Sequence, residues 1–301
     1  MSVMRWMMYP YPFRYVRPQT LDEALRWAET DGMRFLAGGQ SLLPLLNLHW
    51  AEVAGVIDLK SVGHEFNHVQ WKAGEIEFGA WLTHHELATL EPLATRCPLI
   101  PRAAVHIGHP RIRRRGTVGG ALAHGDPLAE WFLAFLTLNA SVVTRSRAYP
   151  RRVTPIQEWL LGPLMPNLLP GEIVTGVQVS LPERASYGFL EVSRRAGDYA
   201  IMAAGVQLIW DASYHQITGC TLAISGANDL PRTFPLISKA VQGQAPGSEL
   251  WRFVEDAVQK AVDPYADVLA SKDYRRHLAG VLARRVCEQA TQQREVLTRT
   301  T

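Results

Sequence analysis

Cysteine is scarce in this chain of 301 residues, which contains only Cys97, Cys220 and Cys287. The three lie far apart and no C-x-x-C pair occurs, so the sequence excludes a disulfide scaffold and a structural zinc site. The same scarcity excludes an iron–sulfur cluster carried by this chain alone, because clusters are held by sets of cysteine thiolates.

Long apolar runs are also missing. The longest uncharged stretch, residues 35–51, is broken by glycines, a proline and polar residues, whereas a membrane-spanning helix needs about 20 predominantly apolar residues. Residues 1–15 mix arginines and prolines with aromatics and contain no apolar signal core. We therefore expect a cytoplasmic protein without a membrane span.

Lysine is rare as well, since only 5 of the 31 basic residues are lysines. The net charge of +3 does not by itself indicate nucleic-acid binding. Hydrophobic residues make up 47% of the chain and charged residues 20%, which is typical of a soluble folded protein. A chain of this length exceeds one compact core, so we expect two or three sub-domains.

The hydrophobic pattern divides the chain near residues 60 and 182. Residues 1–60 have the pattern of a β-α-β unit, with a helix opened by a Thr20–Glu23 capping box and strands at 33–36 and 53–59. In residues 61–182 we expect, in order, two short strands within 69–82, a helix after Thr83, a glycine- and proline-rich segment at 101–130, a buried helix at 131–138, and strands at 141–145 and 173–181.

Residues 183–301 have a different pattern. Strands are expected at 189–194, 201–210 and 219–225, joined by short polar loops as in an antiparallel meander. Helices are expected at 236–242, 251–261 and 274–293, the last with one face marked by Leu278, Val281, Leu282, Arg285 and Val286. The predicted fold class is therefore α+β.

Two glycine loops are the most informative features. In the first, a strand leads into Gly38-Gly39-Gln40-Ser41, and glycines without a Cβ let backbone amides converge on an anion. The pattern is neither a Rossmann fingerprint nor a Walker loop, and by itself it also fits a plain tight turn.

The second loop is Gly116-Thr117-Val118-Gly119-Gly120, preceded by four arginines between residues 111 and 115. Two such loops suit a ligand with two linked phosphates, such as a dinucleotide. A solvated basic turn and a nucleic-acid patch remain alternatives, although no aromatic residue interleaves the arginines as a stacking platform.

Three segments then resemble the FAD-binding flavoprotein subunit, or medium subunit, of molybdenum hydroxylases such as carbon monoxide dehydrogenase and xanthine dehydrogenase. They are residues 37–44, residues 108–127, and residues 192–200, which resemble that family's signature at the start of its C-terminal domain. The opening segment 13–18 and the arginine pairs at 275–276 and 284–285 also fit. The resemblance covers nearly the whole chain in order.

The resemblance implies a fold of the PCMH/vanillyl-alcohol-oxidase type. Two α/β sub-domains, residues 1–60 and 61–182, would hold FAD between them, and an antiparallel sheet with helices, residues 183–301, would cover the flavin. The residues implied to bind FAD are Leu36, Ala37, Gly38, Gly39, Gln40, Ser41, Leu42, Ile107, Gly116, Thr117, Val118, Gly119, Gly120, Ala121, Asp126, Glu130, Val174, Arg195, Asp198 and Tyr199.

Their implied roles differ. Residues 37–41 and 117–121 would wrap the pyrophosphate, Ile107 would lie near the flavin or adenine, and Glu130 would be an acidic cofactor contact. Tyr199 would lie against the isoalloxazine face, supported by Arg195 and Asp198. No catalytic residue and no metal ligand is implied for this chain.

The resemblance also implies a function and partners. A large subunit would carry molybdopterin and bind the substrate, and a small subunit would carry [2Fe–2S] clusters. This chain would take electrons from those clusters at non-covalent FAD and pass them to NAD, a quinone or oxygen. The scarcity of cysteine agrees with this division.

The sequence departs from the family at several positions. Arg111 and Arg114 replace the usual Gln and Asn, and Ala121 replaces a usual Asn or Ser. His49 stands where Arg is common, and Leu190 occupies a position that is Lys in some relatives. The arginines keep hydrogen-bond donors for phosphate but lose acceptors, which leaves the affinity for FAD open.

Histidines cluster in two places. Adjacent His84 and His85 point about 100° apart on a helix, so we expect surface residues and no metal site. His106, His109 and His124 flank the second loop and could touch the flavin or carry it covalently.

Two other functions remain open. A stand-alone flavin oxidase or dehydrogenase of the same superfold would need its own acid or base, for which only Tyr199 and His109 are candidates. An assembly or scaffolding protein that has lost FAD is supported only by the departures at residues 111, 114 and 121.

Overall fold

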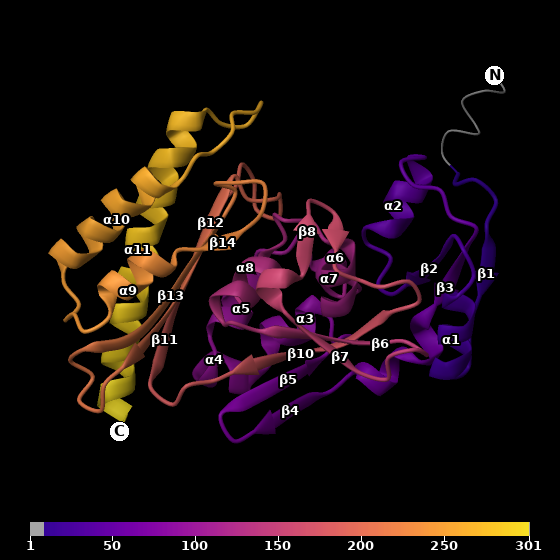
Figure 1. The fold of residues 1–301 in the computed structure, drawn as a ribbon, viewed down its shortest axis with the longest axis horizontal. Coiled ribbons are helices and arrows are strands. Elements are labelled where there is room, and N and C mark those ends of the chain that lie inside the picture. Colours follow the sequence, from indigo (N-terminus) through magenta and orange to yellow (C-terminus); the bar gives the residue numbers. More distant parts are fainter. Residues whose placement is uncertain (1–8, 301) are drawn as a thin grey trace.

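The computed structural model describes residues 9–300 of the chain, with side chains up to residue 294. Residues 1–8 and 301, which belong to the first and last predicted domains and include part of the segment searched for a signal, lie outside the described residues. Figure 1 shows three sheets following one another along the molecule, each with its own helices. No helix among the described residues is long and apolar enough to span a membrane.

The first sheet is parallel, with the strand order β1-β3-β2. Its elements are β1 (Arg14–Val16), α1 (Leu21–Ala28), β2 (Met33–Leu36), α2 (Leu42–Asn47) and β3 (Gly55–Asp58). The Thr20 hydroxyl accepts a hydrogen bond from the Glu23 amide at 3.2 Å, as the capping box predicts. The Glu23 carboxylate, however, accepts from the amide of Gln19 and not from that of Thr20.

The second sheet is antiparallel, with the order β4-β5-β10-β6-β7. Its strands are β4 (Val69–Lys72), β5 (Glu75–Gly79), β6 (Ser141–Arg145), β7 (Arg152–Pro155) and β10 (Ile173–Ser180), and a small hairpin is formed by β8 (Leu160–Gly162) and β9 (Met165–Pro166). Single turns of 3-10 helix occur at η2 (Leu59–Ser61), η3 (Gly63–Phe66) and η4 (Ile156–Glu158).

The glycine- and proline-rich segment at residues 101–130 contains only short helices before α8. The helices of this part are α3 (His84–Thr89), α4 (Glu91–Arg96), α5 (Leu99–Ala104), α6 (Pro110–Arg113), α7 (Val118–His124) and α8 (Glu130–Thr137). The helices α5, α6 and α7 are seven residues long or shorter. The glycines and prolines in and between them interrupt the helical pattern at short intervals, so no long helix can form.

The third sheet is the predicted antiparallel meander, in the order β11-β12-β13-β14. Its strands are β11 (Ala185–Val192), β12 (Met202–Trp210), β13 (Ile217–Ser225) and β14 (Arg232–Thr233), and its helices are α9 (Pro235–Val241), α10 (Ser248–Ala261) and α11 (Lys272–Thr300). Figure 1 shows these helices covering one face of the sheet. On α11 the predicted apolar face is buried at Leu278, Leu282 and Val286, but Arg285 is exposed and was wrongly included.

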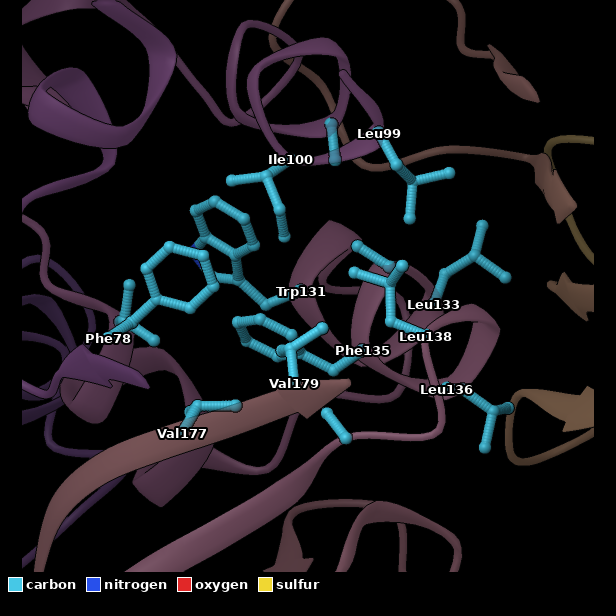
Figure 2. Close-up of a cluster of buried hydrophobic side chains, with 14 of the residues drawn as sticks. Phe78, Leu99, Ile100, Trp131, Leu133, Phe135, Leu136, Leu138, Val177 and Val179 are labelled. Atoms are coloured by element: carbon cyan, nitrogen blue, oxygen red, sulfur yellow. The ribbon is translucent and has the colours of Figure 1, made fainter. Parts of the chain in front are cut away.

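The central core joins the second and third sheets. All residues of α8 are buried, and α8 packs against α5, β12 and β13. Figure 2 shows Trp131 and Phe135 beside Phe78 of β5 and Val177 of β10; the rings of Trp131 and Phe135 stack with centroids 5.4 Å apart. The helix therefore anchors the C-terminal sheet to the central one.

His84 belongs to this core, and the expectation of a surface position was wrong. The residue is 5% exposed, and its Nδ1 accepts a hydrogen bond from Trp131 Nε1 at 2.9 Å. Its neighbour His85 is exposed, as expected. Periodicity placed both residues on one short helix but could not reveal that Trp131 supplies a donor to only one of them.

We expect the stability of the protein to fall at mildly acidic pH because of His84. Burial, with a smaller effect of the Arg113 charge, lowers the pKa of His84 from 6.5 to about 4. Between about pH 6.5 and pH 4, this histidine is protonated in the unfolded chain but not in the folded one. The free energy of unfolding should therefore fall by about 3 kcal/mol as the pH drops through this range. His84→Asn, which keeps an acceptor near the position of Nδ1, should remove this component in urea unfolding measured at several pH values.

The exposed neighbour provides the control, since His85→Asn should leave the pH dependence of unfolding unchanged. An equally steep dependence in His84→Asn and in the unmodified protein would contradict the assignment.

A second prediction concerns the contact between β11 and α11. A Cβ on Gly188 would lie 2.1 Å from the carbonyl oxygen of Val286, so Gly188→Ala must push the helix away from the sheet. We expect the free energy of unfolding to fall by about 1–3 kcal/mol. Gly247→Ala, where a Cβ meets no atom within 4 Å, should change it little, and equal losses in the two variants would refute the packing argument.

Candidate functional site

The first glycine loop joins β2 to α2 and offers free backbone donors. Within the described chain, the amides of Gly38, Gly39, Gln40 and Ser41 donate no hydrogen bond to protein atoms. Gly39 has φ +70, a conformation that favours glycine. The Gln40 side-chain amide donates to the Gly38 carbonyl at 2.9 Å and holds the turn in shape. A turn with several unused amides is suited to bind an anion.

The second glycine loop is held against the central sheet. The Thr117 hydroxyl caps α7 by accepting from the Gly120 amide at 3.1 Å. The Val118 and Gly119 amides donate to the carbonyls of Leu82 and Ala80 at 3.0 and 2.8 Å. Most donors of this loop are therefore already used, so the two loops are not equivalent, and the first supplies most of the free amides.

The two loops touch each other. A Cβ on Gly38 would lie 2.0 Å from the carbonyl oxygen of Arg115. A Cβ on Gly120 would lie 3.6 Å from the Cβ of Ala37. The family resemblance implied that both loops wrap one pyrophosphate, and their contact leaves no space for a side chain at position 38.

Arginines surround this contact in two different ways. Arg113 is partly buried and donates to the carbonyls of Ile107 and Gly108 at 3.1 and 2.7 Å, which fixes that turn. Arg111, Arg114 and Arg115 are exposed, and within the described chain their side chains make no hydrogen bond or ion pair. Three unpaired cations therefore belong to the segment whose backbone meets the first loop at Arg115.

The third predicted segment lies against the second. Gly197 has φ +85, and a Cβ there would lie 2.9 Å from the carbonyl group of Gly108. Arg195 and Asp198 pair at 3.1 Å on the surface. Tyr199 is half-exposed, and partial burial together with the nearby Asp126 carboxylate raises the pKa of its phenol.

Several ionisable side chains, buried or partly buried, lie close in sequence or in space to these segments. Glu130, at the start of α8, is 6% exposed, and burial reinforced by the charge of Glu191 raises the pKa of Glu130 to about 8. His106 Nδ1 lies 3.1 Å from Glu191 Oε1, and this contact raises the pKa of His106. Asp126 accepts a hydrogen bond from the Leu128 amide at 2.9 Å.

Glu191 was missed by sequence reasoning, although one signal was available. It is a charged residue within the apolar strand expected at 189–194, and its side chain is only 2% exposed. A carboxylate buried in a strand needs a hydrogen-bonding or charged partner. A glutamate within this apolar run therefore indicated that a polar group lies against the strand.

The other predicted residues occupy the edges of the site. Leu36 ends β2 and Leu42 begins α2, while Ala121 lies in α7. Gly116 lies beside His84, whose Nε2 would be 2.6 Å from a Cβ at position 116. Val174 is buried in β10 within the central core, and α7 packs against that strand.

Comparison with known families matches the chain in two parts. Residues 11–183 match the family described as the FAD binding domain in molybdopterin dehydrogenase. Residues 187–290 match the family described as the CO dehydrogenase flavoprotein C-terminal domain.

Curated relatives match over nearly their whole length. The chain is 32% identical to the glyceraldehyde dehydrogenase medium chain of Sulfolobus acidocaldarius over 276 residues, which is 91% of this chain and 97% of that one. It is also 32% identical to the nicotine 6-hydroxylase medium subunit of Paenarthrobacter nicotinovorans over 279 residues, 92% of this chain and 96% of the relative.

Solved structures share the fold. A chain of quinoline 2-oxidoreductase from Pseudomonas putida 86 superposes with a TM-score of 0.88 at 28% identity, covering 95% of this chain and 99% of that chain. A chain of carbon monoxide dehydrogenase from Hydrogenophaga pseudoflava gives a TM-score of 0.89 at 25% identity, with the same coverage. The expected fold is confirmed, and the chain belongs to the FAD-binding medium subunits of the molybdenum hydroxylases, which are oxidoreductase subunits.

Proposed function

We propose that this subunit passes electrons from the [2Fe–2S] clusters of a small partner subunit, through FAD, to an external acceptor such as NAD, a quinone or oxygen. A large molybdopterin-binding subunit would oxidise the substrate. The observation that carries the proposal is the contact of the two glycine loops at Gly38, beside free amides and unpaired arginines. This arrangement fits the linked phosphates of FAD.

The cysteines support a separate cluster-bearing subunit. Burial raises the pKa of the Cys97 and Cys220 thiols to about 12, and it also raises that of Cys287 well above its ordinary value. Iron–sulfur clusters are held by sets of cysteine thiolates, and the described residues contain no group of three or more His, Cys, Asp or Glu side chains that could hold a metal ion. Clusters that supply electrons would therefore be held by another chain.

The residues of this chain would bind and orient the cofactor. The amides of residues 38–41 and the Thr117 hydroxyl would hold the pyrophosphate, and Arg111, Arg114 and Arg115 would balance its charge. Ile107 and Tyr199 would flank the flavin, with Arg195 and Asp198 supporting the tyrosine loop. When bound, FAD supplies the redox chemistry, while the protein contributes position and electrostatics.

The proposal is tested by purifying the chain alone and together with its partner subunits. We expect a yellow protein alone and a brown complex in which substrate reduces the flavin only when the partners are present. A colourless chain would favour the scaffold alternative, and oxidation of simple alcohols or amines by the isolated chain would favour a stand-alone oxidase.

The glycine contact gives a direct prediction. Gly38→Ala places a Cβ where the Arg115 carbonyl lies, so the loops must separate, and we expect FAD affinity to fall about tenfold or more. Flavin content after gel filtration and fluorescence titration with FAD measure the effect. Gly247→Ala should retain normal flavin content, and full flavin occupancy in Gly38→Ala would sink the proposed site.

The arginines give a second prediction. An exposed charge contact contributes up to about 1 kcal/mol, so Arg114→Asn, which restores the residue usual in the family, should weaken FAD binding about two- to fivefold. Binding should also become less sensitive to salt, because one cation–phosphate contact is lost. Arg151→Asn, at another exposed arginine, is the control. Identical salt dependence in the two variants would exclude a phosphate contact at position 114.

A further inference from the structure

An arginine near the start of α11 is buried in the C-terminal part of the chain. Arg275 is 2% exposed, and its Nη2 donates a hydrogen bond to Asp267 Oδ2 at 2.6 Å. Its guanidinium carbon lies 4.8 Å from the ring centre of Tyr265. Asp267 is itself held by the amides of Leu269 and Ala270, each at 2.9 Å from its Oδ1. The segment before α11 therefore fixes the guanidinium in one orientation.

The guanidinium also joins two strand ends of the C-terminal sheet. Its Nη1 donates to the carbonyls of Ile201 and Gly226 at 2.5 and 3.2 Å. Ile201 directly precedes β12, and Gly226 directly follows β13. Gly226 has φ +85, and a Cβ there would lie 2.4 Å from the carbonyl oxygen of Ile201. The two segments thus meet without a side chain between them, and the guanidinium bridges their carbonyls.

Ile201 closes the loop that carries Tyr199. This loop, residues 193–201, connects β11 to β12. Its two ends are joined by the Ile201 amide, which donates to the Val192 carbonyl at 2.7 Å. Tyr199 precedes Ile201 by two positions. The hydrogen bond from Arg275 to the Ile201 carbonyl therefore holds the end of the loop that is closer in sequence to the tyrosine.

The same corner of the sheet is tied to the segment that follows the second glycine loop. Ser225, directly before Gly226, is 3% exposed, and its hydroxyl donates to the Pro127 carbonyl at 3.1 Å. Pro127 follows Asp126, and the Asp126 carboxylate, after burial, raises the pKa of the Tyr199 phenol. The position of this corner therefore affects the tyrosine both through its own loop and through the segment of Asp126.

We propose that Arg275 is a positioning residue of the flavin site, which holds the base of the 193–201 loop and thereby fixes Tyr199 against the isoalloxazine. This inference rests on the FAD site proposed above. An apolar residue at this place in α11 would avoid the cost of burying a charge, and among the described residues Arg275 Nε has no hydrogen-bond partner. The arginine is explained by its planar fork, which bonds two carbonyls and a carboxylate in one fixed geometry.

Arg275→Lys tests the fork and not the charge. A lysine keeps a positive charge near Asp267, but its ammonium is a point charge on a flexible stem and does not reproduce the fork. Arg276→Lys is the matched control, because Arg276 is the next residue of α11, is partly exposed and pairs with Asp273 at 3.0 Å.

The first experiment follows the loop in the purified chain and does not depend on flavin binding. Trypsin cleaves after arginine, and Arg194 and Arg195 are exposed in the loop. We expect cleavage there to be about fivefold faster or more in Arg275→Lys, because a loop without its anchor opens more often. Cleavage after the exposed Arg151, and every cleavage in Arg276→Lys, should keep its rate. No acceleration in the loop, or equal acceleration after Arg151, would overturn the proposal.

The second experiment asks whether Arg275 acts through Tyr199. An aromatic ring against the isoalloxazine quenches flavin fluorescence, so bound FAD should be brighter in Tyr199→Ala and in Arg275→Lys than in Arg276→Lys. Tyr199→Ala and Arg275→Lys should each bind FAD about five- to tenfold more weakly. The double variant should bind no more weakly than Tyr199→Ala alone, because both changes remove the same contact.

Two results of this experiment have different meanings. Additive losses of affinity, or unchanged fluorescence in Arg275→Lys, would overturn the positioning role and leave the FAD site intact. Absence of FAD binding in the unmodified chain would instead defeat the proposed function and the flavin role of Arg275 with it, and the trypsin comparison would still decide whether Arg275 holds the loop.

A further variant reaches the same corner without changing the arginine, and it also serves where Arg275→Lys does not fold. Gly226→Ala forces a Cβ against the Ile201 carbonyl, so it should loosen the loop as Arg275→Lys does. Gly243→Ala is its control, because Gly243 has a similar φ of +77 but a Cβ there meets no atom within 4 Å. We expect faster loop cleavage and brighter bound FAD only in Gly226→Ala, and identical behaviour of the two glycine variants would refute the proposal.

Discussion

Two backbone segments meet at Gly38 without a side chain between them, and the site depends on this contact. The first loop follows a strand of the parallel sheet and the second belongs to the central part of the chain, so Gly38 against the Arg115 carbonyl joins two parts built on different sheets. The second loop is fixed because its amides bond to the carbonyls of Ala80 and Leu82. Because the first loop packs against this fixed second loop, its own free amides are held at a defined position.

The C-terminal part is attached to this frame by few but specific contacts. Gly197 packs against Gly108, and Arg102 of α5 donates to the Tyr187 carbonyl of β11 at 2.6 Å. Together with the His106–Glu191 pair, these contacts place the segment that contains Gly197 and Tyr199 against the turn at Gly108. Apolar packing of α8 against β12 and β13 provides the stability, while the polar contacts set the relative position of the segments around the site.

Much of the fold could be read from local patterns. The capped helices after Thr20 and Thr83 and the meander strands were predicted because caps and hydrophobic periodicity act over a few residues. The pairing of β10 with both β5 and β6 was not predicted, since it joins β10 to residues about 100 positions away in β5 and about 30 positions away in β6. The short helices between residues 99 and 124 were hidden by their glycines and prolines.

The sequence by itself determined the two glycine loops, the arginines beside them and the scarcity of thiols, because these depend only on which residues are present and in what order. Only the tertiary structure decided which donors stay free, that His84 is buried against Trp131, and that the Glu191 side chain is buried beside His106. The physical reason is that hydrogen bonding and desolvation depend on neighbours distant in the chain, and no local pattern records them.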